Sequence, residues 1–154
     1  MGAVESRLAD LGLELPEVAK PVAAYVPAVR SGDHVFTSGQ LPMRSGELMH
    51  TGKVGAEVGA DEAAQCAQQC ALNAMAAVKS VIGDLDKVTR VVKVVAFVAS
   101  TPDFTGQPQV ANGASELIAS AFGDAGQHAR SAVGVSVLPL DSPVEVEITV
   151  EVGA

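Results

Sequence analysis

One segment near the end of the chain constrains the fold more than any other. In Val144–Val152, aliphatic residues alternate strictly with Glu145, Glu147, Thr149 and Glu151. A repeat of two residues places the two kinds of side chain on opposite faces of a β-strand. The segment therefore predicts a strand in a sheet that has one face packed against an apolar core.

Periodicity and turn residues predict the other elements. Strands are expected at residues 22–29 and 34–38, paired as a hairpin around Ser31-Gly32-Asp33, and at 88–99 and 129–138. Helices are expected at 4–11, from Asp61 to Gly83, and from about Pro108 to Gly123, where apolar residues recur every three or four positions. Residues 39–59, rich in glycine, are expected to form an ordered but irregular loop.

The order of these elements is β-β-α-β-α-β-β after a short N-terminal helix. Grouped hairpins and separate helices favour an α+β fold in which two helices cover one face of a mixed sheet. We expect one domain over residues 1–154, with 1–20 as an N-terminal extension. Residues 91–97 and 132–138 are apolar on both faces of their strands. This pattern indicates an oligomer whose sheets pack together, with sites at the seams.

Charge argues against several classes of partner. Acidic residues outnumber basic ones by 18 to 10, which gives a formal net charge of −8. Nucleic-acid binding depends on basic side chains that neutralise phosphates, so no nucleic-acid partner is expected. Glu5, Asp10 and Glu14 interrupt the N-terminal region, and no long uncharged apolar stretch follows. We therefore expect no signal peptide, no membrane partner and a cytoplasmic location.

No established catalytic or metal-binding motif is found in the sequence. Cys66 and Cys70 are four residues apart in a predicted helix, where they are either two metal ligands or two small buried thiols. No His, Asp or Glu lies at matching spacing, and the three histidines are dispersed. We expect neither a metal nor a cofactor and assign the two cysteines no chemistry.

Arg130 is the strongest candidate for chemistry. It precedes eight uncharged residues, 131–138, in a predicted strand. A guanidinium inside a sheet offers a planar fork that matches a carboxylate, although an exposed or acid-paired arginine is the alternative. If the last two strands pair antiparallel, Glu145 or Glu147 lies near Arg130; otherwise both are solvated acids. Tyr25, in the first predicted strand, is either a ligand donor or a buried ring.

Three blocks of sequence resemble the Rid family, also called YjgF or liver perchloric-acid-soluble protein. They are Tyr25–Pro42 with Ser38-Gly39-Gln40-Leu41-Pro42, the unit from Ala71 to Phe104, and Ala129-Arg130-Ser131 with Leu138-Pro139 and Val144–Glu147. The resemblance covers about residues 20–152. It implies a chorismate-mutase-like fold and a homotrimer with clefts between subunits.

The resemblance also implies an activity and a set of site residues. Archetypal members are enamine/imine deaminases, which hydrolyse 2-imino acids to 2-keto acids and ammonia without a cofactor. By position, Arg130 would hold the substrate carboxylate and Glu145 would position the attacking water. The cleft would be lined by Tyr25, Ser38, Gly39 and Asn112.

The sequence departs from the archetype near Arg130. His128 and Ala132 stand where the archetype has Pro and Cys, and His128 is a candidate second donor to the ligand. The loop at residues 43–59 is longer, which indicates a divergent branch. Two alternatives to the deaminase stay open: a non-catalytic trimer that binds a small carboxylate as a sensor, and an endoribonuclease, against which the acidic composition argues.

Overall fold

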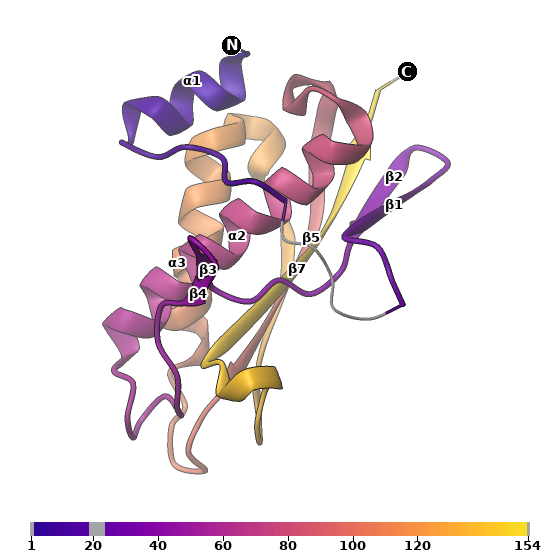
Figure 1. Ribbon diagram of the computed structural model, residues 1–154. Coiled ribbons are helices and arrows are strands. Elements are labelled where there is room, and N and C mark those ends of the chain that lie inside the picture. Colours follow the sequence, from indigo (N-terminus) through magenta and orange to yellow (C-terminus); the bar gives the residue numbers. More distant parts are fainter. Residues whose placement is uncertain (1, 19–23, 154) are drawn as a thin grey trace.

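The computed structural model describes residues 2–18 and 24–153 (Figure 1). Its helices are α1 (Ala3–Asp10), α2 (Ala60–Ile82) and α3 (Gln107–Phe122). Its strands are β1 (Ala28–Ser31), β2 (His34–Thr37), β3 (Met43–Arg44), β4 (Glu47–Leu48), β5 (Val88–Ala99), β6 (Ala129–Val135) and β7 (Val144–Val152). Short 3-10 turns are η1 (Leu85–Lys87), η2 (Gly123–Gly126) and η3 (Pro139–Asp141). The predicted α+β order is confirmed.

The five-stranded sheet has the order β1-β2-β7-β5-β6. β6 pairs in parallel with β5 and, among the described strands, with no other, whereas β7 lies between β2 and β5 and is antiparallel to both. The expectation that the last two strands pair with each other is therefore wrong. A strand that follows a short turn usually pairs with its predecessor, but here the turn after β6 carries the chain past β5.

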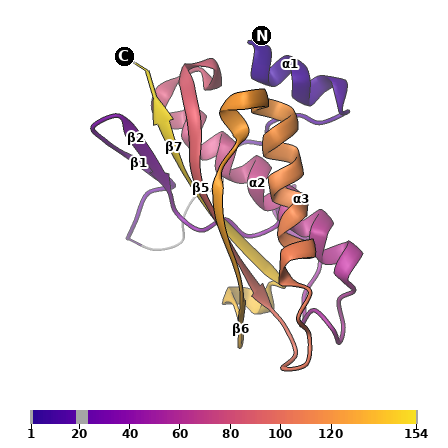
Figure 2. The same cartoon turned by 180° about the vertical axis from the view of Figure 1, so that it is seen from behind.

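The helices lie on one face of the sheet, and the other face is open (Figures 1 and 2). The valines of β7 and Ile148 are buried under the helices, as the alternation predicts. Small residues let α2 approach its neighbours closely. A Cβ on Gly113 of α3 would lie 1.9 Å from the carbonyl oxygen of Ala64, so only glycine permits this helix contact. Val81, near the end of α2, departs from the apolar periodicity of this helix and is 38% exposed.

The N-terminal extension is tied to the helical layer. The Asp86 carboxylate accepts hydrogen bonds from the backbone N–H groups of Ala3 (2.8 Å) and Val4 (3.0 Å), the first residues of α1. These bonds lower the pKa of Asp86. Arg7 donates to the carbonyl of Ala121 (3.1 Å), and Glu5 pairs with Lys79. The helix is thus held by α2, α3 and η1.

Three segments differ from the sequence-based expectation. β1 begins at Ala28, so Tyr25 lies outside the strand. Residues 22 and 23, where the strand was predicted to begin, lie outside the described residues. β6 ends at Val135 because its only neighbour, β5, ends at Ala99. The 39–59 loop contains the small β3–β4 hairpin, whose strands are too short for a periodic signal. No helix in residues 2–18 or 24–153 is long and apolar enough to span a membrane.

Candidate functional site

Arg130 is held against α3 by two side chains. Its Nη1 donates to Asn112 Oδ1 at 2.7 Å and to Ser115 Oγ at 3.2 Å. Arg130 is half-buried, and no carboxylate among the described residues pairs with it. Its Nε and Nη2 make no hydrogen bond with any protein group described. One edge of the guanidinium is therefore available for an anion.

His128 completes this group. Its Nε2 lies 2.8 Å from Ser115 Oγ, and its Nδ1 lies 2.6 Å from the carbonyl oxygen of Gly126. Both ring nitrogens therefore have partners within the chain, and the role of His128 as a second donor to the ligand stays a prediction. We call Arg130, Asn112, Ser115 and His128 the arginine cluster.

Ser115 was not predicted from the sequence. It lies three residues after Asn112 on α3, so the two side chains share one face of the helix. Two polar residues at this spacing, next to the apolar stripe of α3, are a sequence signal that could have identified Ser115. The signal points to Arg130 only once β6 is known to lie beside α3.

A second group of predicted residues lies at the end of β2. Phe36 pairs with Thr149, and Gln40 pairs with Val146. The chain therefore advances four residues from Phe36 to Gln40 while β7 advances three between the partners. This irregularity is a bulge, and the Thr37 hydroxyl accepts the N–H of Ile148 within it (3.0 Å). Bulges are frequent beside active sites because they redirect side chains and interrupt the ladder.

The bulge brings Gly39 against Glu145. A Cβ on Gly39 would lie 2.4 Å from Glu145 Oε2, so the absent side chain leaves room for the carboxylate. Ser38 donates from Oγ to the carbonyl of Val26 at 2.6 Å, which ties this segment to the chain before β1. We call Ser38, Gly39, Glu145 and Glu147 the glutamate cluster. The backbone N–H of Ser38 donates to the carbonyl of Pro27, which lies two residues after Tyr25. Tyr25 itself is 52% exposed.

The charge of Glu145 is not compensated within the chain. No hydrogen bond or ion pair joins its carboxylate to any residue the structure describes. Desolvation by burial raises the pKa of Glu145, and the nearby negative charge of Glu147 raises it further. A carboxyl group with a raised pKa is better suited to exchange a proton with water or a ligand than an ordinary surface glutamate is.

One chain does not bring the two clusters together. Arg130 is in register with Val94 and Ile148, and its side chain points to the helical face. Glu145 is in register with Phe97 and Val133, whose side chains lie on the open face. The two charged groups therefore leave opposite faces of the sheet, with β5 between their strands.

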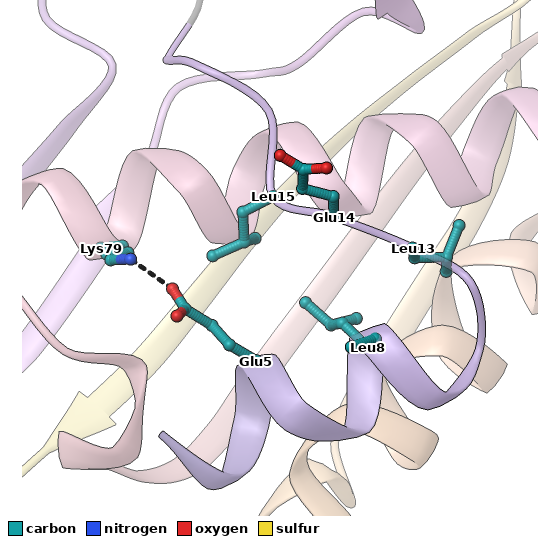
Figure 3. A pocket seen from close by; sticks show the side chains of 7 residues that line it. Glu5, Leu8, Leu13, Glu14, Leu15 and Lys79 are labelled. Atoms are coloured by element: carbon teal, nitrogen blue, oxygen red, sulfur yellow. Dashed lines mark hydrogen bonds and ion pairs between the residues drawn. The ribbon is translucent and has the colours of Figure 1, made fainter. Parts of the chain in front are cut away.

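A groove elsewhere on the molecule contains none of the predicted site residues. It lies between α1, residues 11–15 and α2, with a volume of about 430 Å³ (Figure 3). Leu8, Leu13 and Leu15 line it, and the Glu5–Lys79 ion pair and Glu14 stand at its edge (Figure 3).

The two cysteines are buried, unbridged thiols on α2. Burial raises the pKa of Cys66 to about 11 and raises that of Cys70 further above its usual range, so both remain protonated at neutral pH. No group of three or more His, Cys, Asp or Glu residues that could hold a metal ion occurs in the described part of the chain.

Comparison with known proteins assigns the family. A family model described as "YjgF/chorismate mutase-like, putative endoribonuclease" matches residues 5–152. The chain is 46% identical over 151 residues to protein TCP17 of Trypanosoma cruzi, covering 97% of this chain and 94% of that protein. It is 34% identical over 137 residues to a 2-iminobutanoate/2-iminopropanoate deaminase of Dermatophagoides farinae, covering 88% and 91%.

A solved structure resembles the chain over nearly its whole length. The crystal structure of a protein of unknown function from Agrobacterium tumefaciens superposes with a TM-score of 0.92 at 46% identity and covers 98% of this chain and 94% of that one. The chain therefore belongs to the YjgF/chorismate mutase-like family, the family also called Rid.

Proposed function

We propose that this protein hydrolyses small 2-imino acids to 2-keto acids and ammonia. The observation that carries the proposal is the unpaired Nε–Nη2 edge of Arg130, whose Nη1 is anchored to α3. A guanidinium fixed at one end and open at the other is a receptor for a carboxylate. The 34% identical relative, a 2-iminobutanoate/2-iminopropanoate deaminase, supports this choice of substrate.

Hydrolysis of an imine requires the protein mainly to position the substrate and a water. The carbon of a protonated imine is electrophilic, so water adds to it and ammonia leaves, which converts C=N to C=O. Arg130 holds the substrate carboxylate and fixes the position of the imine carbon. Glu145, with its raised pKa, accepts a proton from the attacking water. Asn112, Ser38, Gly39 and Tyr25 line the same cleft.

This arrangement requires more than one copy of the chain, and we propose a homotrimer. Arg130 and Glu145 leave opposite faces of the sheet, so a second copy has to supply one of them. The open face carries apolar side chains that one chain leaves uncovered: Val29 is 50%, Phe36 44% and Val133 43% exposed. Packing the open faces together would cover these side chains.

A non-catalytic carboxylate-binding trimer is the second candidate. The observation in its favour is the pair of substitutions beside Arg130, where His128 and Ala132 stand in place of the archetype's Pro and Cys. These changes leave the carboxylate receptor intact and alter the surroundings of the reacting carbon. An endoribonuclease is less well supported, because the formal net charge of −8 disfavours RNA.

The proposal is tested in a coupled assay. A pyridoxal-phosphate dehydratase releases 2-iminobutanoate from threonine, and formation of the keto acid is followed with and without this protein. We expect wild type to accelerate keto-acid release and Arg130→Ala to abolish the acceleration. Arg90→Ala is the matched control, because Arg90 is an exposed arginine of β5. Binding of 2-oxobutanoate without acceleration would favour the sensor, and equal rates for wild type and Arg130→Ala would refute the deaminase.

A further inference from the structure

The hydrogen bonds of the arginine cluster are all satisfied when they run in one direction, from Arg130 through Ser115 and His128 to Gly126. Arginine has donors and no acceptors, so Ser115 Oγ must accept at its contact with Arg130. The Ser115 hydroxyl hydrogen is then left for His128 Nε2, 2.8 Å away. A carbonyl oxygen accepts only, so the 2.6 Å contact with Gly126 requires a proton on His128 Nδ1. Every group is satisfied when the ring is neutral and carries its proton on Nδ1.

The far end of this chain of hydrogen bonds is fixed in the fold. Gly126 is buried at the end of η2, where it packs against α3. A Cβ at this position would lie 2.6 Å from the carbonyl oxygen of Ile118 and 3.1 Å from Cα of Ala119. Gly126 therefore lies directly on the α3 backbone. Its carbonyl oxygen is a rigid reference point for the His128 ring.

At the Arg130 end of this chain of hydrogen bonds, the contacts determine which side of the guanidinium is free to meet a ligand. Asn112 Oδ1 and Ser115 Oγ both contact Nη1, and together they use the two hydrogens on that nitrogen. The Nε hydrogen and the Nη2 hydrogens remain. The Nε hydrogen and one of the Nη2 hydrogens lie along one side of the guanidinium and point in nearly parallel directions, which suits the two oxygens of a carboxylate.

We propose that His128 is a positioning residue that acts through Ser115 to hold Arg130 with its Nε–Nη2 side toward the carboxylate of the ligand. The nature of the ligand rests on the proposed function, whereas the hydrogen-bond chain does not. His128 itself touches no ligand in this arrangement. It orients the Ser115 hydroxyl, which in turn orients the guanidinium.

Binding measurements test the positioning role. The affinity for 2-oxobutanoate is measured by isothermal titration calorimetry for wild type, Ser115→Ala, His128→Leu and the double variant. We expect each single variant to bind about fivefold to tenfold more weakly, the loss that corresponds to one ordinary hydrogen bond. Because the two residues act in series, the double variant should bind no more weakly than Ser115→Ala. Additive losses, or unchanged affinity in both single variants, would overturn the proposal.

A conservative variant separates positioning from packing. In His128→Gln, the side-chain amide oxygen reaches about as far as Nε2 and can accept the Ser115 hydroxyl. We expect its affinity to stay within about twofold of wild type, whereas His128→Leu, of similar size, loses affinity. Equal losses in Gln and Leu variants that both retain the wild-type melting temperature would mean that the ring acts through its shape.

A spectroscopic measurement does not depend on the ligand. Nitrogen chemical shifts of the His128 ring should report the tautomer with its proton on Nδ1, and Ser115→Ala should change the Nε2 shift most. A ring protonated on Nε2 alone would overturn the proposal even if 2-oxobutanoate binds. If instead the Nδ1 tautomer is present and Arg130→Ala binds 2-oxobutanoate as wild type does, the proposed function fails together with the positioning role.

Discussion

The arginine cluster and the glutamate cluster differ in how far one chain completes them. Around Arg130, each contact runs from a donor to an acceptor and ends at a backbone carbonyl that packs on α3. Around Glu145, a half-buried carboxylate has a second acid nearby, and no cation pairs with it in residues 2–18 and 24–153. The first cluster is preorganised, as our proposal of a carboxylate-binding role requires. The second is held in an unfavourable electrostatic state that a ligand, a water or a second copy of the chain would relieve.

This difference predicts separate roles for the two charged residues. Glu145→Gln should lower turnover of 2-iminobutanoate by at least about a hundredfold, the usual contribution of a general base. Affinity for 2-oxobutanoate should change little, because Arg130 and its partners are untouched. Stopped assays for turnover and calorimetry for binding check the two effects. If Glu145→Gln weakens binding as strongly as Arg130→Ala does, the division into a binding cluster and a catalytic cluster is wrong.

The sequence predicted the parts of the fold that depend on local pattern. The alternation in β7 and the β-branched run in β5 gave both strands with the bounds found in the structure. The helices at 60–82 and 107–122 begin and end within about a residue of the expected positions, because glycines follow both. Local periodicity reports which side of an element is buried, and these elements each have one well-defined buried side.

The arrangement of the strands was not available from local pattern. Nothing in the residues of β6 and β7 indicates that β5 lies between them, so the predicted neighbourhood of Arg130 and Glu145 within one sheet was wrong. The role of Ser115 depends on the same information, since α3 reaches Arg130 only because β6 is the edge strand beside it. The close approach of Gly39 to Glu145 depends on a bulge that no sequence motif marks.

Two glycines provide a sharper comparison between the clusters. The Cβ of Gly126→Ala would meet backbone atoms of α3, whereas that of Gly39→Ala would meet the end of the Glu145 side chain. Backbone cannot move aside easily, so Gly126→Ala should destabilise the fold by about 1–3 kcal/mol, or several degrees in melting temperature. Gly39→Ala should leave the melting temperature nearly unchanged but lower turnover about tenfold, because it displaces a reacting group.

The control for Gly39→Ala is the same change in a protein that already lacks the carboxylate. In the Glu145→Ala background, Gly39→Ala should cause no further loss of turnover, since the carboxylate that the new Cβ would displace is gone. Calorimetric melting and the coupled assay measure the two quantities. A large drop in melting temperature for Gly39→Ala would show that the glutamate cluster is as rigidly built as the arginine cluster.

The smallest expected effect is the change in the pKa of Glu145 when the charge of Glu147 is removed. The charge of Glu147 raises the pKa of Glu145, although desolvation is the larger cause. A raised pKa means that Glu145 takes up its proton, and turnover falls, at a higher pH than an ordinary glutamate would require. Removing the charge with Glu147→Gln should therefore lower the pKa of Glu145 and move the acid limb of the pH–rate profile to lower pH. The limb should still lie above the ordinary glutamate range, because burial is unchanged.

Glu151→Gln is the matched control for this prediction. Glu151 lies on the same face of β7, but it is six residues from Glu145, about 20 Å along the strand, where screening by salt removes most of its influence. A shift that is the same in both variants would reflect the net charge of the surface, and no shift in either would mean that burial alone sets the pKa of Glu145. A shift in Glu147→Gln alone ties the titration to the glutamate cluster itself, which is the property that separates it from the arginine cluster.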